Sequence, residues 1–291
     1  MPKYKLTKQG AVTTVKSASD IKLMITSDIH FDSQYCYREM FFEDIIRAID
    51  SGYKIAIIGD FFDAMQGRFD PRRDMSKVRP EYRVEKYYDA LVEDAISHLT
   101  PYQEHILMIT YGNHETSVLK NANTDLIDRL TKGLSTKKHK VHSGGYGGVM
   151  MLSTKNRVVP AKYFHGSGGE APVTRGAIQT NRQAVFLPDF QIIMNGHSHN
   201  SYWIPIVRER VTNDGEHYFD IQHHIRTAGY SMPYGDGSKG WEVSRGGVPK
   251  PIGSCFIDVD DNDIYVTPLI HAPIPFEPEN DQYEGPIFPQ E

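Results

Sequence analysis

Three short apolar runs separated by helical patterns constrain the fold of this chain more than any other feature. The runs cover residues 21–26 (IKLMIT), 54–58 (KIAII) and 105–110 (HILMIT), which suits buried strands. Between them, residues 38–50 and 84–99 repeat apolar side chains at helical spacing and stop before Ser-Gly and Thr-Pro pairs. Strands that alternate with helices predict βαβ units and a largely parallel sheet.

A further helix is expected to begin near residue 125. Residues 125–130 have the apolar spacing of a helix, and Asn123 or Thr124 is the expected cap. After residue 140 the pattern changes, and glycines and short strand-like stretches dominate. These stretches lie at 157–164, 191–194, 256–259 and 264–267. We expect them to form a second, more antiparallel sheet of the same domain.

The sequence predicts one folded domain followed by a tail. No Pro- or Ser-rich linker separates the two halves, so we expect a single domain over residues 1–270. A basic insert over about residues 64–100 separates the second and third strands. The segment 271–291 is Pro-rich and acidic and contains no Lys or Arg, so it is expected to form an extended tail.

Composition and charge narrow the class of protein. Charged residues make up 24% of the 291, and no long apolar window predicts a membrane span. The first residues lack the apolar core of a signal peptide, and Cys36 and Cys255 are expected to be reduced thiols of a cytoplasmic protein. The net charge of −5 excludes the basic footprint of a DNA-coating protein. An enzyme with a local basic patch remains compatible with it, and the oligomeric state stays open.

Side chains with lone pairs follow the strand-like segments directly. In open α/β sheets, ligands bind beyond the carboxyl ends of the strands, so these side chains are expected to converge. Carboxylate, amide and imidazole groups without thiolate suit Mn²⁺, Fe or Zn²⁺. Seven candidates exceed the set of one zinc site and suit two ions. They are Asp28, His30, Asp60, Asn113, His165, His197 and His199, and Gly59, Gly112 and Gly196 would let the backbone approach closely.

These residues form five blocks, D-x-H, G-D-x-x-D, G-N-H-E, H and G-H-x-H, which run in this order from Asp28 to His199. The pattern resembles that of the calcineurin-like metallophosphoesterases. This resemblance implies an α/β fold, a four-layer sandwich of two mixed β-sheets packed face to face and flanked by helices. The site would lie at one edge of that sandwich.

The resemblance also implies a role for each site residue. One ion would be held by Asp28, His30 and His199, the other by Asn113, His165 and His197, with Asp60 bridging both. His114 would stabilise or protonate the leaving oxygen, and Asp63 would orient His114. The cofactors would be two divalent metal ions. We expect Mn²⁺, with Zn²⁺, Fe and Ni²⁺ as alternatives.

The implied activity is hydrolysis of phosphodiester bonds by a hydroxide that two metal ions activate. The block GDFFD is similar to that of recombination-repair nucleases of this family, which favours DNA, RNA or a nucleotide as substrate. A phosphomonoesterase acting on phosphoproteins or nucleotides would use the same ions. A non-catalytic scaffold is a third alternative, although scaffolds lose ligands that this chain retains.

Four arginines are candidates for substrate binding, with a solvated, salt-bridged surface as the alternative interpretation. Arg68 and Arg72 lie in the basic insert, and Arg175 and Arg182 follow His165. Residues 226–253 are also similar to the late region of phage and prophage members of the family. This similarity implies a phage-encoded origin in a bacterial host.

Overall fold

The chain forms two mixed β-sheets flanked by helices, as the resemblance implied. The computed structural model describes residues 4–65, 73, 77–168, 173–235, 237–238 and 240–274. One sheet has the strand order β13 (Ile264–His271), β12 (Ile252–Val259), β3 (Ile21–Thr26), β4 (Lys54–Ile57), β5 (Ile106–Ile109), β6 (His142–Ser143). The other has the order β1 (Lys5–Gln9), β2 (Val12–Lys16), β7 (Gly147–Ser153), β8 (Val158–Phe164), β9 (Ile192–Asn195), β11 (His217–Arg226), β10 (Tyr202–Val211).

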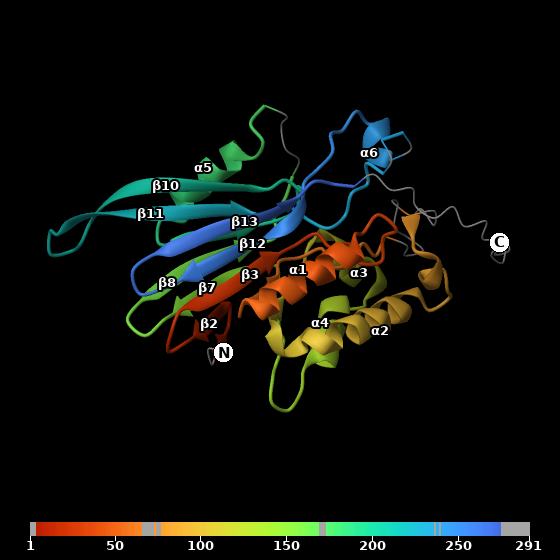
Figure 1. Ribbon diagram of the computed structural model, residues 1–291, viewed down its shortest axis with the longest axis horizontal. Coiled ribbons are helices and arrows are strands. Elements are labelled where there is room, and N and C mark those ends of the chain that lie inside the picture. Colours follow the sequence, from red (N-terminus) through yellow and green to blue (C-terminus); the bar gives the residue numbers. More distant parts are fainter. Residues whose placement is uncertain are drawn as a thin grey trace.

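Helices lie on both sides of this pair of sheets. They are α1 (Arg38–Asp50), α2 (Tyr87–Leu99), α3 (Asn113–Ala122), α4 (Leu126–Leu134), α5 (Ala177–Phe186) and the short α6 (Trp241–Ser244), with 3₁₀ turns at Pro80–Tyr82 and Thr100–His105. Figure 1 shows α1 to α4 together on one side and α5 on the other, beside the long β10–β11 hairpin. This arrangement confirms the sandwich.

We had expected the second sheet to be formed by residues after 140, but the two sheets do not divide the chain in this way. Strands β12 and β13 complete the first sheet, where Cys255 of β12 pairs antiparallel with Ile25 of β3. Strands β1 and β2 join the second sheet, where Val15 pairs parallel with Leu152 of β7. The sheets thus exchange strands from the two ends of the chain. Strand β12 pairs with the edge of β3 and strand β2 with the edge of β7, whose backbone amides would otherwise lack partners.

Three helix boundaries also differ from the sequence-based expectation. Helix α2 begins at Tyr87 rather than at residue 84. The cap of α4 is Asp125, whose side chain accepts a hydrogen bond from the Asp128 amide at 2.9 Å. Asn123 instead ends α3 in the left-handed conformation, with a φ of 51°. Helix α3 itself was not predicted.

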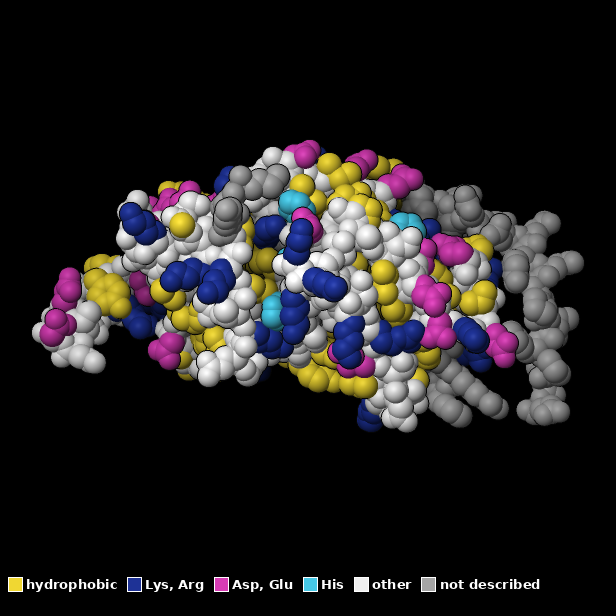
Figure 2. Space-filling view, turned by 90° about the horizontal axis from the view of Figure 1, so that it is seen from below, with side chains coloured by type: hydrophobic (Ala, Val, Ile, Leu, Met, Phe, Trp, Pro, Cys, Tyr) yellow, Lys and Arg dark blue, Asp and Glu magenta, His cyan; other side chains and the backbone are white. Residues whose placement is uncertain are grey.

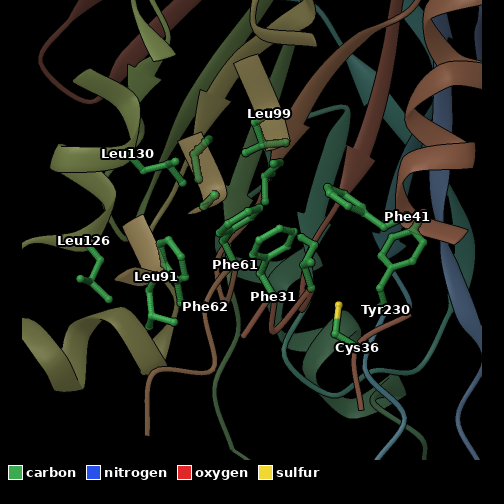
Figure 3. Close-up of a cluster of buried hydrophobic side chains, with 14 of the residues drawn as sticks. Phe31, Cys36, Phe41, Phe61, Phe62, Leu91, Leu99, Leu126, Leu130 and Tyr230 are labelled. Carbon is green, nitrogen blue, oxygen red and sulfur yellow. The ribbon is translucent and has the colours of Figure 1, made fainter. Parts of the chain in front are cut away.

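Two apolar cores lie on opposite sides of the six-stranded sheet. Leu23 and Ile25 of β3 pack between the sheets, and Met24 faces the helices. Figure 3 shows the helical side, where Phe31 and Phe61 lie among side chains from α1, α2 and α4. Their rings stack with centroids 5.3 Å apart and are fully buried. Phe31 directly follows His30, and Phe61 directly follows Asp60. The packing of the two rings therefore fixes the loops that carry these candidate ligands.

Charge is unevenly distributed over the surface. Figure 2 shows Lys and Arg side chains gathered near the middle of one face, whereas acidic side chains lie toward its ends. The predicted tail beyond residue 274 lies outside the described residues, as does most of residues 66–76 of the insert. In the part of the chain that the structure describes, no helix is long and apolar enough to span a membrane. Cys36 and Cys255 are both buried and form no disulfide.

Candidate metal centre

Loops at the ends of the central strands place the predicted ligands at one edge of the sandwich. Adjacent loops are joined by backbone hydrogen bonds, from the Asp28 amide to Gly59 O and from the His30 amide to Asp60 O, both at 3.1 Å. Five candidate ligands have φ angles between 48° and 78°, a conformation that is strained for residues other than glycine. They are Asp28, His30, Asp60, His197 and His199. Such strain costs about 1–3 kcal/mol per residue and is concentrated at functional sites.

Three donor atoms converge in a first group made of Asp28, His30 and His199. The two Nε2 atoms of His30 and His199 are 3.3 Å apart, and Nε2 of His199 is 3.4 Å from Oδ1 of Asp28. Nδ1 of His30 donates to Oδ1 of Asp63 at 2.9 Å, which leaves Nε2 facing the other donors. These are the three residues that the family pattern assigned to one ion.

A second group is made of Asp60, His165 and His197. Nδ1 of His165 donates to the carbonyl of Ile58 at 2.8 Å, so Nε2 faces the carboxylates. That Nε2 is 3.0 Å from Oδ2 of Asp60 and 3.8 Å from Oδ1 of Asp28. Asn113, the first residue of α3, is exposed and lines a cavity together with His165.

Three of the buried polar atoms that lack a hydrogen-bond partner belong to candidate ligands. Among the described residues, Oδ1 of Asp28 and Nδ1 of His197 are buried without a hydrogen-bond partner, and Nε2 of His165 is buried with only the Asp60 carboxylate, at 3.0 Å, near it. Burying such a group without a partner costs free energy unless a metal or water completes it. A carboxylate oxygen and two imidazole nitrogens fit a divalent cation, so the residues present suit the implied metals.

Two glycines at the site have no room for a side chain. A Cβ at Gly112 would lie 1.9 Å from Oδ1 of Asp60, and one at Gly59 would lie 2.5 Å from Nδ1 of His165. Gly59 also has a φ of 76°, which favours glycine. The backbone therefore approaches the candidate ligands as closely as the sequence suggested.

His114 lies beside the ligands and is fixed on one side. Its Nδ1 donates to the backbone carbonyl of Asp63 at 2.6 Å, and its amide donates to Oδ1 of Asp60 at 3.0 Å. Nε2 of His114 is 3.8 Å from Oδ2 of Asp60. The expected contact with Asp63 is thus made by the main chain, because the Asp63 carboxylate is 3.6 Å from His114 and is bonded to His30.

The histidines of the site fall into two groups, those whose pKa is raised and those whose pKa is lowered. Burial lowers the pKa of His30, but the bonded Asp63 carboxylate and the nearby Asp60 and Asp28 outweigh it and raise that pKa to about 9. For His165, burial is likewise outweighed by Asp60 and Asp28, and its pKa rises to about 10. Burial lowers the pKa of His199 to about 4, and burial with His165 lowers that of His197.

The pKa values of two buried carboxylates at the site shift in opposite directions. Burial opposes the ionised form of Asp60, but the neighbouring His114, His165 and His30 hold its pKa well below the ordinary value. Asp60 therefore stays charged between the two groups of donors. For Glu115, burial and then the Asp60 charge raise the pKa to about 7, against the effect of its N–H donors.

Two buried acids support the candidate ligands, and sequence reasoning missed the first of them, Asp32. Asp32 accepts hydrogen bonds from the amides of Asp63 and Ala64 at 2.6 and 2.9 Å, and from the Tyr87 hydroxyl at 2.6 Å. Its position, two residues after His30, continues the alternation Asp28-x-His30-x-Asp32 and is the signal that identifies it. Glu115 accepts from the amides of Asp60, Phe62 and Gly112 at 3.2, 2.9 and 2.8 Å.

The four predicted substrate arginines have different positions. Arg175 lines a cavity of about 950 Å³ together with Asn200, the residue after His199. Arg182 is exposed on α5 and does not line that cavity. Arg68 and Arg72 lie outside the described residues.

Solved structures with a similar chain course share little sequence with this chain. GAP50 of Plasmodium is 13% identical with a TM-score of 0.40, covering 90% of this chain and 92% of that one. Zinc-complexed Vps29 of Entamoeba histolytica is 9% identical with a TM-score of 0.38, covering 84% and 90%. A metallophosphoesterase of Sphaerobacter thermophilus is 15% identical with a TM-score of 0.32, covering 85% and 88%. No curated protein matches the chain.

The sequence model of one family does match. It is the calcineurin-like phosphoesterase family, and its match spans residues 21–201, from the start of strand β3 to two residues beyond His199. The matched span is more than half of the chain and contains every donor of the two groups. Metal-assisted hydrolysis of a phosphate ester uses divalent ions held by oxygen and nitrogen donors, and this geometry provides such donors. The chain therefore belongs to the calcineurin-like phosphoesterase family.

Proposed function

We propose that the protein is a metal-dependent phosphodiesterase that acts on nucleic acid or nucleotides. The phosphoester chemistry is supported by the two groups of converging donors and by the family. One observation supports the choice of a diester, namely that one cavity is lined by the candidate ligands Asn113 and His165 and a second cavity is lined by Asn200, the residue after His199. A phosphodiester has two organic substituents to accommodate, whereas a monoester has one.

The two cavities differ in size and lining. The smaller, of about 380 Å³, is lined by Asn113 and His165 themselves. The larger, of about 950 Å³, is lined by Asn200 and by the cations Arg175, Arg245 and Lys250, with Glu242 as the one carboxylate among its lining residues. Its excess of positive charge favours an anionic chain such as a further nucleotide phosphate.

The residues at the centre have distinct tasks in the proposed reaction. When bound, two divalent ions would lower the pKa of a water molecule and offset charge on the phosphate oxygens. Asp28, His30 and His199 would hold one ion, and Asn113, His165 and His197 the other, with Asp60 between them. We expect Mn²⁺, because the donors are oxygen and imidazole nitrogen without sulfur.

His114 would serve the leaving group. The Asp63 carbonyl accepts the Nδ1 proton of His114, so Nε2 is the atom that faces the candidate centre. A proton carried there can be donated to the leaving oxygen as the ester bond breaks. Asp63 would serve both histidines, since its carbonyl orients His114 and its carboxylate orients His30.

The test compares a diester with a monoester of the same leaving group. Purified protein with added Mn²⁺ is assayed on bis-p-nitrophenyl phosphate and on p-nitrophenyl phosphate. We expect turnover of the diester and a loss of more than about 100-fold in Asp60→Ala, because even residues that only orient metal ligands are worth 10–100-fold.

Asp189→Ala is the matched control, since Asp189 is an exposed carboxylate between α5 and β9. This variant should keep wild-type turnover. If only the monoester is hydrolysed, the phosphodiesterase assignment is wrong and a phosphatase is indicated. If neither ester reacts although the ions are bound, the proposed activity is wrong.

A further inference from the structure

We infer that the smaller cavity binds a nucleobase, so that the preferred substrate is a phosphodiester whose nucleoside stacks on Tyr146 and Phe164. This inference rests on the proposed function and specifies its substrate. The lining of the cavity includes the aromatic residues Tyr111, Tyr146 and Phe164, the candidate ligands Asn113 and His165, and polar residues of α3.

The position of the cavity ties it to the reacting phosphate. Two of its lining residues, Asn113 and His165, are candidate ligands, so a group bound there is attached directly to a phosphate held at the centre. Its volume of about 380 Å³ lies near the lower end of the range for small-molecule sites and suits one nucleoside rather than a longer segment.

Aromatic rings form one side of the cavity and remain open to solvent. Tyr146 is 51% exposed and Phe164 is 38% exposed, although both are large aromatic side chains. Tyr146 stacks on Tyr111 with ring centroids 5.4 Å apart and an interplanar angle of 29°. Exposed aromatic faces beside a phosphate-binding centre are the usual platform for an unpaired base.

The platform is held rigidly. The Tyr111 hydroxyl donates to the carboxylate of Asp125, the cap of α4, at 2.6 Å. The Tyr111 amide donates to the carbonyl of Gly145, the residue before Tyr146, at 2.9 Å. A base that stacks on Tyr146 would therefore meet a surface that is already ordered, which lowers the entropic cost of binding.

The other side of the cavity is polar and carries one cation. Helix α3 contributes the hydroxyls of Thr116 and Ser117, the amide of Asn121 and the ammonium group of Lys120. A nucleobase has apolar faces and hydrogen-bonding edges, and this lining offers a counterpart to each.

The experiment compares two diesters that share a p-nitrophenolate leaving group and differ only in the other substituent. One is thymidine 5′-(p-nitrophenyl phosphate), and the other is methyl p-nitrophenyl phosphate. With Mn²⁺-loaded protein we expect kcat/KM to be about 10- to 100-fold higher for the nucleoside ester, the range that one stacked base provides. Tyr146→Ala and Phe164→Ala should reduce that ratio, and Tyr146→Phe should restore it.

Tyr265→Ala is the matched control, because Tyr265 is a 53% exposed tyrosine on β13 that does not line the cavity. Binding gives a second readout, in which calorimetry of the Mn²⁺-loaded protein should show AMP binding at least tenfold more tightly than ribose 5-phosphate. Equal kcat/KM for the two esters, or equal binding of AMP and ribose 5-phosphate, would overturn the base site while leaving the phosphodiesterase intact. If neither ester is hydrolysed, the proposed function fails and this inference fails with it.

Discussion

At the scale of single residues, the histidines of the candidate centre differ in the protons they hold. In the metal-free protein the pKa of His30 is about 9 and that of His165 about 10, so both are protonated at neutral pH. The pKa of His199 is about 4, so this ligand is already neutral. A cation can bind His30 and His165 only by displacing those protons.

This difference predicts proton release on metal binding. At pH 7 we expect about two protons to leave per chain when both ions bind. Calorimetric titration of Mn²⁺ in two buffers with different ionisation enthalpies measures that number directly. The affinity for Mn²⁺ should also increase as the pH rises toward 9. Binding without proton release would show that His30 and His165 are not ligands.

His114 predicts a dependence on the leaving group. His114→Ala should slow hydrolysis of a nucleotide diester by about 10²–10⁴-fold, because its alkoxide needs a proton to leave. The loss should be smaller with a p-nitrophenyl ester, whose phenolate leaves without one. Metal content, measured by elemental analysis, should be unchanged. His217→Ala, an exposed histidine on the β10–β11 hairpin, is the control. An equal loss with both leaving groups would contradict proton donation by His114.

At the scale of elements, one buried carboxylate joins helix α3 to the loop after β4. Glu115 accepts three backbone amides, those of Asp60, Phe62 and Gly112. Glu115→Ala would leave these three donors without partners. Each buried group without a partner costs about 1–3 kcal/mol, so we expect the free energy of unfolding to fall by about 3 kcal/mol or more. The Mn²⁺ affinity should fall as well, because one of these amides is that of Asp60 and another is that of Gly112, the residue before Asn113. Urea unfolding and metal titration measure both effects, with the exposed Glu104→Ala as control.

A second buried carboxylate connects α1 to the end of β13. Asp44 accepts from the Tyr230 hydroxyl at 2.8 Å and bonds Nε2 of His271 at 2.9 Å. We expect Asp44→Ala to lower the free energy of unfolding by about 3 kcal/mol, since it leaves both partners without their acceptor. Asp50→Ala, at an exposed position of the same helix, should change it by less than about 0.5 kcal/mol. Equal effects of the two substitutions in urea unfolding would refute this role.

The elements also show what the sequence alone could predict. Apolar runs that end in Asp, Asn or His pointed to the candidate ligands, most of which the fold brings together, because strand polarity places these ends at one edge. Helix α3 was missed because only Glu115 and Val118 are buried on it, which leaves almost no apolar periodicity. The exchange of strands between sheets was also missed, since pairing of β12 with β3 depends on contacts more than 200 residues apart along the chain. The nucleobase cavity was missed because Tyr111, Tyr146 and Phe164 meet only in the folded chain.

At the scale of the whole molecule, the metal-free protein is expected to lose stability in alkaline solution. The folded pKa values of His30 and His165 are raised above the unfolded value of 6.5, so their contribution is fully present below pH 6.5. That contribution is lost as the pH rises through 9 to 10. Thermal unfolding with a chelator present should therefore show a falling midpoint over this interval. With Mn²⁺ bound the fall should be much smaller, and identical curves with and without Mn²⁺ would contradict the coupling.

The central claim is that the two groups of donors hold two divalent ions with Asp60 between them. Anomalous X-ray diffraction at the manganese edge from crystals grown with Mn²⁺ tests this claim most directly. We predict two peaks per chain, one beside Asp28, His30 and His199, the other beside Asn113, His165 and His197, about 3.5–4 Å apart. A single peak, or two peaks away from Asp60, would contradict the account.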